Sequence, residues 1–371
     1  VLIDAWYLYP KLASNVIIYE NNFYNLTSGF ELTLIGGKDF VIHNNSVSNV
    51  DYGAKVMGSS LFTQNLTLEN NSILAKNNGI LYLCTASHTS FRNNLFKSNL
   101  IESIGEEAIS LDNCRGEIGF YNNTIQSPKT AIDLYSSDAV IDSNTIIGNC
   151  VPENCLRVSF SKVAEIGIKL NKNSEAEIIS NSIVNFYTSV YVEDSLSNSI
   201  ATNNINFTYT GIQSIDSDLA IYENNFSNSY NAINLLNSEA LITGPKFETF
   251  DIGIQSFNST VTVDQVVLNN GNLCMSFIDS NYTILNYQNL NCIEAILYEK
   301  YFVNFKIQTN DGDPSPQHQF NYMTGLQNGD GFTNYTGFSD YYLITTKKID
   351  NAGLTTNFNP LRVFYSHNGI E

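Results

Sequence analysis

The sequence predicts an all-β chain, a parallel β-solenoid of about twelve coils followed by a small β domain. The octapeptide IYENNFYN at 18–25 returns as IYENNFSN at 221–228. Between the two copies an Asn-Asn pair, or a Ser-Asn or Thr-Asn pair, recurs at intervals that lie mostly between 21 and 26 residues. Apolar residues alternate with polar ones on both sides of each pair. A period near 22 residues is typical of repeats that stack and bury a shared core.

The second asparagine of each pair is predicted to form a column of inward-facing corners. Apolar residues three and five positions before it and two positions after it indicate short strands, each buried on one face. Asparagine tolerates the left-handed backbone that a sharp corner needs, and stacked amides can hydrogen-bond from coil to coil. The predicted ladder consists of Asn22, Asn45, Asn71, Asn94, Asn123, Asn144, Asn181, Asn204 and Asn225.

A second strand is predicted about ten residues before each corner. It has a small residue, Ile, an outward residue, an inward residue and then Ser, Asn or Asp, as in TAIDLYSS and TGIQSIDS. The outward residues of this strand form one column, consisting of Asp133, Lys169, Tyr191, Gln213, Asn234 and Gln255. This polar column could hold a sugar through hydrogen bonds and stacking, although an ordinary solvated sheet surface has the same composition.

A leucine-rich repeat is the alternative solenoid, because LTLENNSIL at 66–74 fits its consensus. The other half of such a repeat would be helical. Here that half is β-branched, glycine-bearing and rich in turns, which disfavours helix. The parallel β-helix is therefore preferred, and twelve coils spaced by about 4.8 Å give a rod roughly 55–60 Å long.

The repeat G-I-x-L…S…I-x-x-N-x-I resembles the right-handed parallel β-helix repeat of the pectin-lyase-like superfamily, over about residues 10–295. The resemblance implies a right-handed solenoid, which we assign to residues 1–298. We expect no cofactor. It does not fix an activity, because this scaffold carries lyases, hydrolases, epimerases, phage tailspikes and non-catalytic surface proteins.

Residues 299–371 are predicted to form a small β-sandwich. The period disappears after Cys292, and alternating strands with Pro and Gly turns follow. The segment resembles immunoglobulin-like modules that follow β-helices in archaeal and bacterial surface proteins. Asn310, Asp311 and Asp313 offer oxygen ligands for a metal, but the motif is too short for a known calcium loop and is typical of a plain turn.

Composition limits the partners and the compartment. The chain has 36 acidic and 18 basic residues, a net charge of −18, which argues against nucleic acid. It has no apolar run of 18 residues, so no membrane span is expected. It begins with Val1 rather than Met, which indicates a processed protein or a fragment. We expect an extracellular or cell-surface location.

The six cysteines are expected to form three local disulfides, Cys84–Cys114, Cys150–Cys155 and Cys274–Cys292, as is usual in exported proteins. Buried free thiols are the alternative. Ten N-x-S/T sequons are present, a number that the composition yields by chance. Asn225 is expected to remain unglycosylated, because it is predicted to be a member of the ladder. The expected glycosylation sites are Asn25, Asn44, Asn65, Asn70, Asn122, Asn258, Asn281 and Asn334.

No catalytic motif stands out, because the chain has no Asp-Asp pair and no N-T-D or R-I-K sequence. The best acid–base cluster lies in IGEEAISLDNCRGE. A solvated acidic edge with one ion pair would have the same sequence. The weak catalytic candidates are Glu106, Glu107, Asp112, Arg115 and Glu117.

Two functions from different classes remain. The first is an exported structural protein, an adhesin-like subunit of an extracellular filament or envelope layer. The second is a carbohydrate-active enzyme, or a glycan-binding protein on the same scaffold. The opening strand VLIDAWYLYP, with Trp6, Tyr7 and Tyr9, predicts an exposed first coil that the C-terminal domain of another copy covers head to tail.

Overall fold

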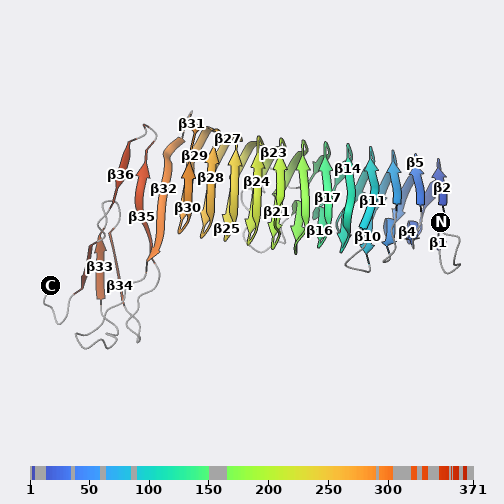
Figure 1. Ribbon diagram of the computed structural model, residues 1–371, viewed down its shortest axis with the longest axis horizontal. Helices are drawn as coiled ribbons and strands as arrows, with labels where there is room; N and C mark the ends of the chain where they lie inside the picture. The colour runs from blue at the N-terminus through green and yellow to red at the C-terminus, as the bar shows by residue number, and fades with distance from the viewer. Residues whose placement is uncertain are drawn as a thin grey trace.

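The computed structural model is a long stack of β-coils that ends in antiparallel strands (Figure 1). No helix occurs in the part of the chain that the structure describes, so the leucine-rich-repeat alternative is wrong there. The structure describes residues 2–4, 14–34, 38–58, 64–84, 90–149, 165–289, 292–303, 319–323, 328–332, 342–350, 352, 354–358 and 362–365.

The smaller of the two solenoid sheets has twelve parallel strands, one per coil, which makes about eleven turns. They are β2 (Ser14–Tyr19), β5 (Lys38–His43), β8 (Gln64–Glu69), β11 (Ser90–Lys97), β14 (Arg115–Tyr121), β17 (Asp138–Asp142), β20 (Glu175–Ile179), β22 (Asn198–Ala201), β24 (Asp218–Tyr222), β26 (Glu239–Thr243), β28 (Thr260–Asp264) and β30 (Asn281–Ile284).

The larger sheet has 22 strands and takes two segments from each coil, a short one directly after the asparagine corner and a second one further on. In β21, β23, β25, β27 and β29 the two segments form one long strand. The strands are β1 (Leu2–Asp4), β3 (Asn22–Tyr24), β4 (Ser28–Leu34), β6 (Ser46–Val50), β7 (Tyr52–Gly58), β9 (Ser72–Ala75), β10 (Ile80–Cys84), β12 (Leu100–Ser103), β13 (Ile109–Asp112), β15 (Thr124–Gln126), β16 (Thr130–Tyr135), β18 (Thr145–Ile147), β19 (Ile166–Asn171), β21 (Ser182–Glu193), β23 (Asn204–Ile215), β25 (Asn225–Leu236), β27 (Lys246–Phe257), β29 (Val266–Ile278), β31 (Tyr287–Asn289), β32 (Cys292–Val303), β35 (Tyr342–Ile349) and β36 (Thr355–Asn357).

The core is a set of apolar columns that run along the axis of the stack. Equivalent residues of successive coils lie in register, as Ile141 and Ile178 do in the smaller sheet. Aromatic residues also stack on their own kind: the ring centroids of Phe96 and Phe120 lie 4.8 Å apart. Because each coil buries its apolar face against the next, the core is continuous along the rod.

An asparagine ladder lines one corner of the stack. The backbone N–H and Nδ2 of Asn45 both donate to Oδ1 of Asn71, at 3.0 Å each, and Nδ2 also donates to the carbonyl of Ile18 in the preceding coil at 3.0 Å. Each member thereby bonds the coils on both sides. The ladder consists of Asn21, Asn45, Asn71, Asn99, Asn123, Asn144, Asn181, Asn203 and Asn224.

The predicted ladder is therefore correct at Asn45, Asn71, Asn123, Asn144 and Asn181 and wrong at four positions. The left-handed residue is not the ladder asparagine but the residue before it, for example Glu20 with φ 55° and Glu223 with φ 49°. In both copies of the octapeptide this places the first asparagine on the ladder. Asn22, Asn204 and Asn225 each lie one residue past it.

Asn94 is buried in the core instead of at the corner. Its Nδ2 donates to the hydroxyl of Tyr82 at 3.3 Å, and its Oδ1 accepts from the N–H of Leu66 at 3.0 Å. The corner of that coil is formed by Ser98, with φ 53°, and Asn99.

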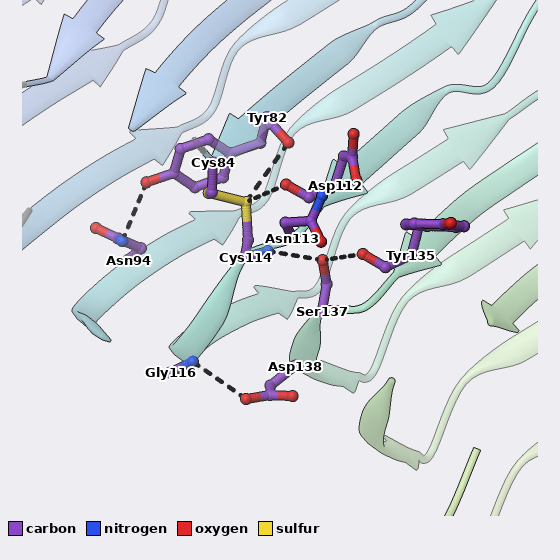
Figure 2. The surroundings of a disulfide bond; sticks show 10 residues. All are labelled: Tyr82, Cys84, Asn94, Asp112, Asn113, Cys114, Gly116, Tyr135, Ser137 and Asp138. Atoms are coloured by element: carbon purple, nitrogen blue, oxygen red, sulfur yellow. Dashed lines mark hydrogen bonds between the residues drawn. A yellow bond between two sulfur atoms is a disulfide. The ribbon is translucent and has the colours of Figure 1, made fainter. Parts of the chain in front are cut away.

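A serine ladder lines a second corner. The N–H of Ser217 donates to Oγ of Ser238 at 3.3 Å, and the same contact links successive coils as far as Ser280. At the other end of this ladder the N–H of Cys114 donates to Oγ of Ser137 at 2.9 Å (Figure 2). Cys114 therefore stands at a serine position, and its sulfur is joined to Cys84 of the neighbouring coil.

The structure pairs Cys84 with Cys114 and Cys274 with Cys292, as the spacing predicted. Both disulfides join neighbouring coils, and all four cysteines are buried. Cys150 and Cys155 lie outside the described residues.

The last solenoid strand continues directly into antiparallel structure. β32 pairs with β29 in parallel and with β35 in antiparallel fashion, and β36 extends this edge. The predicted boundary between residues 298 and 299 falls inside β32. A separate three-stranded antiparallel sheet consists of β33 (Gln319–Met323), β34 (Asn328–Phe332) and β37 (Arg362–Tyr365). The immunoglobulin-like arrangement remains a prediction.

Candidate functional site

The polar column expected on the second strand forms an in-register row on the larger sheet, the outward column. Asp133 pairs with Lys169, Lys169 with Tyr191, and the row continues without a gap through Gln213, Asn234 and Gln255. None of these six side chains is fully buried. Since parallel strands lie about 4.8 Å apart, the row presents one hydrogen-bonding group per coil over roughly 24 Å.

Asp133 is a partly buried carboxylate of the outward column. Its Oδ2 lies 3.9 Å from Nζ of Lys169. Burial raises the pKa of the Asp133 carboxyl; Lys169 opposes this rise, whereas the carboxylates of Glu107 and Asp112 add to it. Oδ1 of Asp133 is buried and has no hydrogen-bond partner among the described residues. The column thus contains a carboxyl group with an unused acceptor, next to a cation.

Two further members of the column have defined surroundings. Burial, followed by the charge of Glu193, raises the pKa of Tyr191 to about 12, so its hydroxyl stays protonated at neutral pH. Oδ1 of Asn234 is buried, and no described residue donates to it. The buried acceptors of Asn234 and Asp133 each carry the penalty of an unsatisfied polar group.

The predicted cluster of Glu106, Glu107, Asp112, Arg115 and Glu117 is not one site, because the chain turns a corner inside it. Asn113, with φ 56°, follows β13, and the next strand, β14, belongs to the other sheet. Glu107 and Asp112 lie close enough to Asp133 to affect its pKa. Arg115 pairs with Asp138 on the smaller sheet instead.

The remaining contacts of these carboxylates are local. Glu106 lies 3.0 Å from Nζ of Lys129. Glu107 accepts a hydrogen bond from Nδ2 of Asn78 at 3.0 Å, and Asp112 accepts one from its neighbour Asn113 at 2.7 Å. Glu117 is exposed on β14. The cluster therefore contributes Glu107 and Asp112 to the surroundings of Asp133, and nothing more to that site.

Three tyrosines form a second feature of the same strands. Tyr187, Tyr209 and Tyr230 stack face to face, with ring centroids 4.7 Å apart at both steps. Because each ring face between them is covered by the next ring, this stack offers mainly edges to a ligand. It is a poor platform for stacking against a sugar.

The expected glycosylation sites differ in accessibility. Asn25, Asn44, Asn70, Asn122, Asn258 and Asn281 are exposed. Asn65 is half-buried, and its amide is held between Asp39, at 2.6 Å, and Asn93, at 3.2 Å. Asn225, expected to be bare, is half-buried and donates to Asn204 at 3.4 Å. The glycosylation itself remains a prediction.

Several predicted residues lie outside the described part of the chain: Trp6, Tyr7, Tyr9, Asn310, Asp311, Asp313 and Asn334. Among the described residues no group of three or more His, Cys, Asp or Glu side chains has a geometry that could hold a metal ion. Nor does a helix long and apolar enough to cross a membrane occur in them.

A family model described as "Right handed beta helix region" matches residues 8–96. No curated protein matches the sequence. Among solved structures, the Dettilon tailspike protein gp208 is similar with a TM-score of 0.48 and 12% identity, over 94% of this chain and 74% of that one.

Two further solved structures are similar at low sequence identity. The A-module of the mannuronan C-5 epimerase AlgE6 from Azotobacter vinelandii has a TM-score of 0.42 and 9% identity, over 74% of this chain and 91% of that one. The tailspike gp49 of Pseudomonas phage LKA1 has a TM-score of 0.43 and 8% identity, over 94% of this chain and 66% of that one.

Proposed function

We propose that this protein is an exported structural β-solenoid that holds an extended, uncharged polyhydroxylated glycan along its outward column. The observation that carries the proposal is the unbroken register from Asp133 to Gln255. The unsatisfied acceptors of Asp133 and Asn234 lie within this row. Hydroxyl groups of a glycan can donate to the amide oxygens of Gln213 and Gln255 and accept from their amide N–H groups.

An extracellular or cell-surface location fits this proposal. The two disulfides that join neighbouring coils are stable in oxidising compartments. The exposed sequons would be usable there. The net charge of −18 disfavours a polyanionic glycan, because a negative field lowers the encounter rate with a negative ligand.

Binding to immobilised neutral and uronic-acid oligosaccharides tests the proposal. We expect a neutral chain of several sugar units to bind, and the double variant Gln213→Ala/Asn234→Ala to weaken it at least 10-fold. The matched control is Thr262→Ala, a half-buried surface position on the smaller sheet. Equal binding by the double variant and the wild type would refute the assignment of the face.

A carbohydrate-active enzyme is the second candidate, and the surroundings of Asp133 favour it. A carboxyl group with a raised pKa beside Lys169, Glu107 and Asp112 resembles a general acid in its electrostatics. Release of reducing ends or unsaturated products from the same glycans measures this activity. Product formation that Asp133→Asn abolishes would establish the enzyme; binding without product supports the structural role.

A further inference from the structure

A groove of about 470 Å³ lies on the outer face of the smaller sheet. The outward column lies on the larger sheet, so the groove and the column are on different sheets of the solenoid. The groove crosses β11, β14, β17 and β20, and the residues that matter most in it are Glu117, Gly119, Tyr121, Glu175 and Glu177. A volume of this size is usual for a small-molecule site. The proposed function makes no use of this face.

The groove has a glycine in its floor and an aromatic ring laid over that glycine. Gly119 lies in register with Leu95 and Val140, both of which have side chains. A Cβ at Gly119 would lie 2.2 Å from Cε2 and 2.7 Å from Cζ of Tyr121. The Tyr121 ring therefore fills the space of the missing side chain and lies along the strand, as part of the groove lining.

Carboxylates without an ion-pair partner among the described residues line the same groove. Asp138 is satisfied, because Arg115 pairs with it and the N–H of Gly116 donates to its Oδ2 at 3.3 Å (Figure 2). The other carboxylates of the groove are Glu117, Glu175 and Glu177, and none of them forms an ion pair with another described residue.

Register brings acids together on this face, and Arg115 offsets only the charge of Asp138. Asp138 lies directly opposite Glu175, and Glu177 follows two residues later on the same strand. Like charges on neighbouring strands destabilise a sheet. Burial, together with the charges of Asp142 and Glu177, also raises the pKa of Tyr121, as expected where the potential is negative. A cationic ligand would relieve this repulsion.

We propose that the groove binds an amino sugar that carries a free ammonium group, as a unit of a deacetylated glycan. The C–H face of the sugar would lie on the Tyr121 ring, and the ammonium would lie among Glu117, Glu175 and Glu177. A bare divalent cation fits less well, since these acids do not form a metal-binding group. A basic peptide would use the carboxylates but would not need a flat ring of this kind.

Calorimetric titration with the glucosamine trisaccharide, and with its fully N-acetylated counterpart, tests the proposal. The charged trisaccharide should bind and the neutral one should not. Binding should weaken as the salt concentration rises, because both partners are exposed to solvent. Equal binding of the two trisaccharides, or no binding of either, would overturn the proposal, and so would tighter binding of a trilysine peptide.

Substitutions in the groove test whether the amino sugar binds there. Glu177→Gln should weaken binding roughly 2- to 5-fold, the range for an exposed ion pair. Tyr121→Ala should weaken it more than Tyr121→Phe, which keeps the ring. Glu239→Gln makes the same change of charge on β26 of the same sheet, outside the groove, and should bind as the wild type does.

The two proposed sites can be told apart. The double variant Gln213→Ala/Asn234→Ala, which disables the outward column, should leave binding of the amino sugar unchanged. Loss of binding in that variant, with Glu177→Gln unaffected, would show that the charged sugar binds at the outward column and would overturn the groove assignment.

Discussion

Asn144 and Asn181 are adjacent members of the asparagine ladder although 37 residues separate them in sequence. The backbone N–H and Nδ2 of Asn144 donate to Oδ1 of Asn181 at 2.9 and 3.0 Å. Elsewhere the ladder advances by 21 to 28 residues per step. The additional residues of this coil are accommodated without interrupting the ladder.

Asn144→Ala should lower the free energy of unfolding by about 1–3 kcal/mol, because the variant leaves buried groups of the adjoining coils without partners. Denaturant unfolding measures the change. The control is Asn204→Ala, at an exposed position beside the ladder, which should cost less than about 0.5 kcal/mol. Equal effects of the two changes would contradict the observed register.

Removal of the Cys84–Cys114 disulfide should destabilise the fold by about 2–4 kcal/mol. Because Cys114 occupies a serine position, its replacement matters. Cys84→Ala/Cys114→Ser can form the hydroxyl contact to the carbonyl of Asp112 that the sulfur now makes at 3.3 Å. This variant should be about 0.5–1.5 kcal/mol more stable than Cys84→Ala/Cys114→Ala. Identical melting of the two would show that a hydroxyl at position 114 makes no stabilising contact.

Asp133 should make the protein less stable as the pH rises. Its folded pKa lies above the unfolded value of about 3.9, so the folded state keeps the proton longer. Below the unfolded pKa, Asp133 does not lower the free energy of unfolding. Above the folded pKa, it lowers that free energy by the full amount. Asp133→Asn should therefore melt as the wild type does near pH 3 and gain relative stability toward pH 7. Lys169→Met should enlarge the penalty, and a constant difference across this range would refute the raised pKa.

Head-to-tail association, predicted from the sequence, should appear as a size that grows with concentration. Sedimentation velocity at several concentrations measures it. Iodide quenching of Trp6, the single tryptophan, gives a second readout, because association should shield it. A monomer of constant size, with quenching of Trp6 that does not depend on concentration, would exclude the filament.

The fold could be predicted because apolar residues recur at the period of one coil. The exact residue that occupies the asparagine corner could not be predicted in every coil. In IIYENNFYN at 17–25 the pairs Asn21–Asn22 and Ile17–Ile18 fit either phase of a two-residue alternation. The structure buries Phe23 and leaves Ile17 59% and Tyr19 55% exposed. Packing of the whole coil decides the phase, and a single repeat does not contain that information.

The sites show the same limit. The outward column was predictable, since its residues hold a fixed place in a regular strand. Glu107 approaches Asp133 from a turn outside the repeat, so its position follows no period. The groove at Tyr121 was missed, although one signal existed: a glycine inside a strand, Gly119, often marks a place where another group lies close to the backbone.

Because of the asparagine ladder, the number of coils in this solenoid can change without disrupting the contacts between coils. Removing residues 182–203 would join Asn181 to Asn204, and the next ladder residue after Asn181 would be Asn224, while Ser174 would meet Ser217 at the second corner. Each coil meets the same contacts above and below, so one unit can be lost or copied without a new interface. Such a chain can act as a molecular ruler, adjustable in steps of about 4.8 Å.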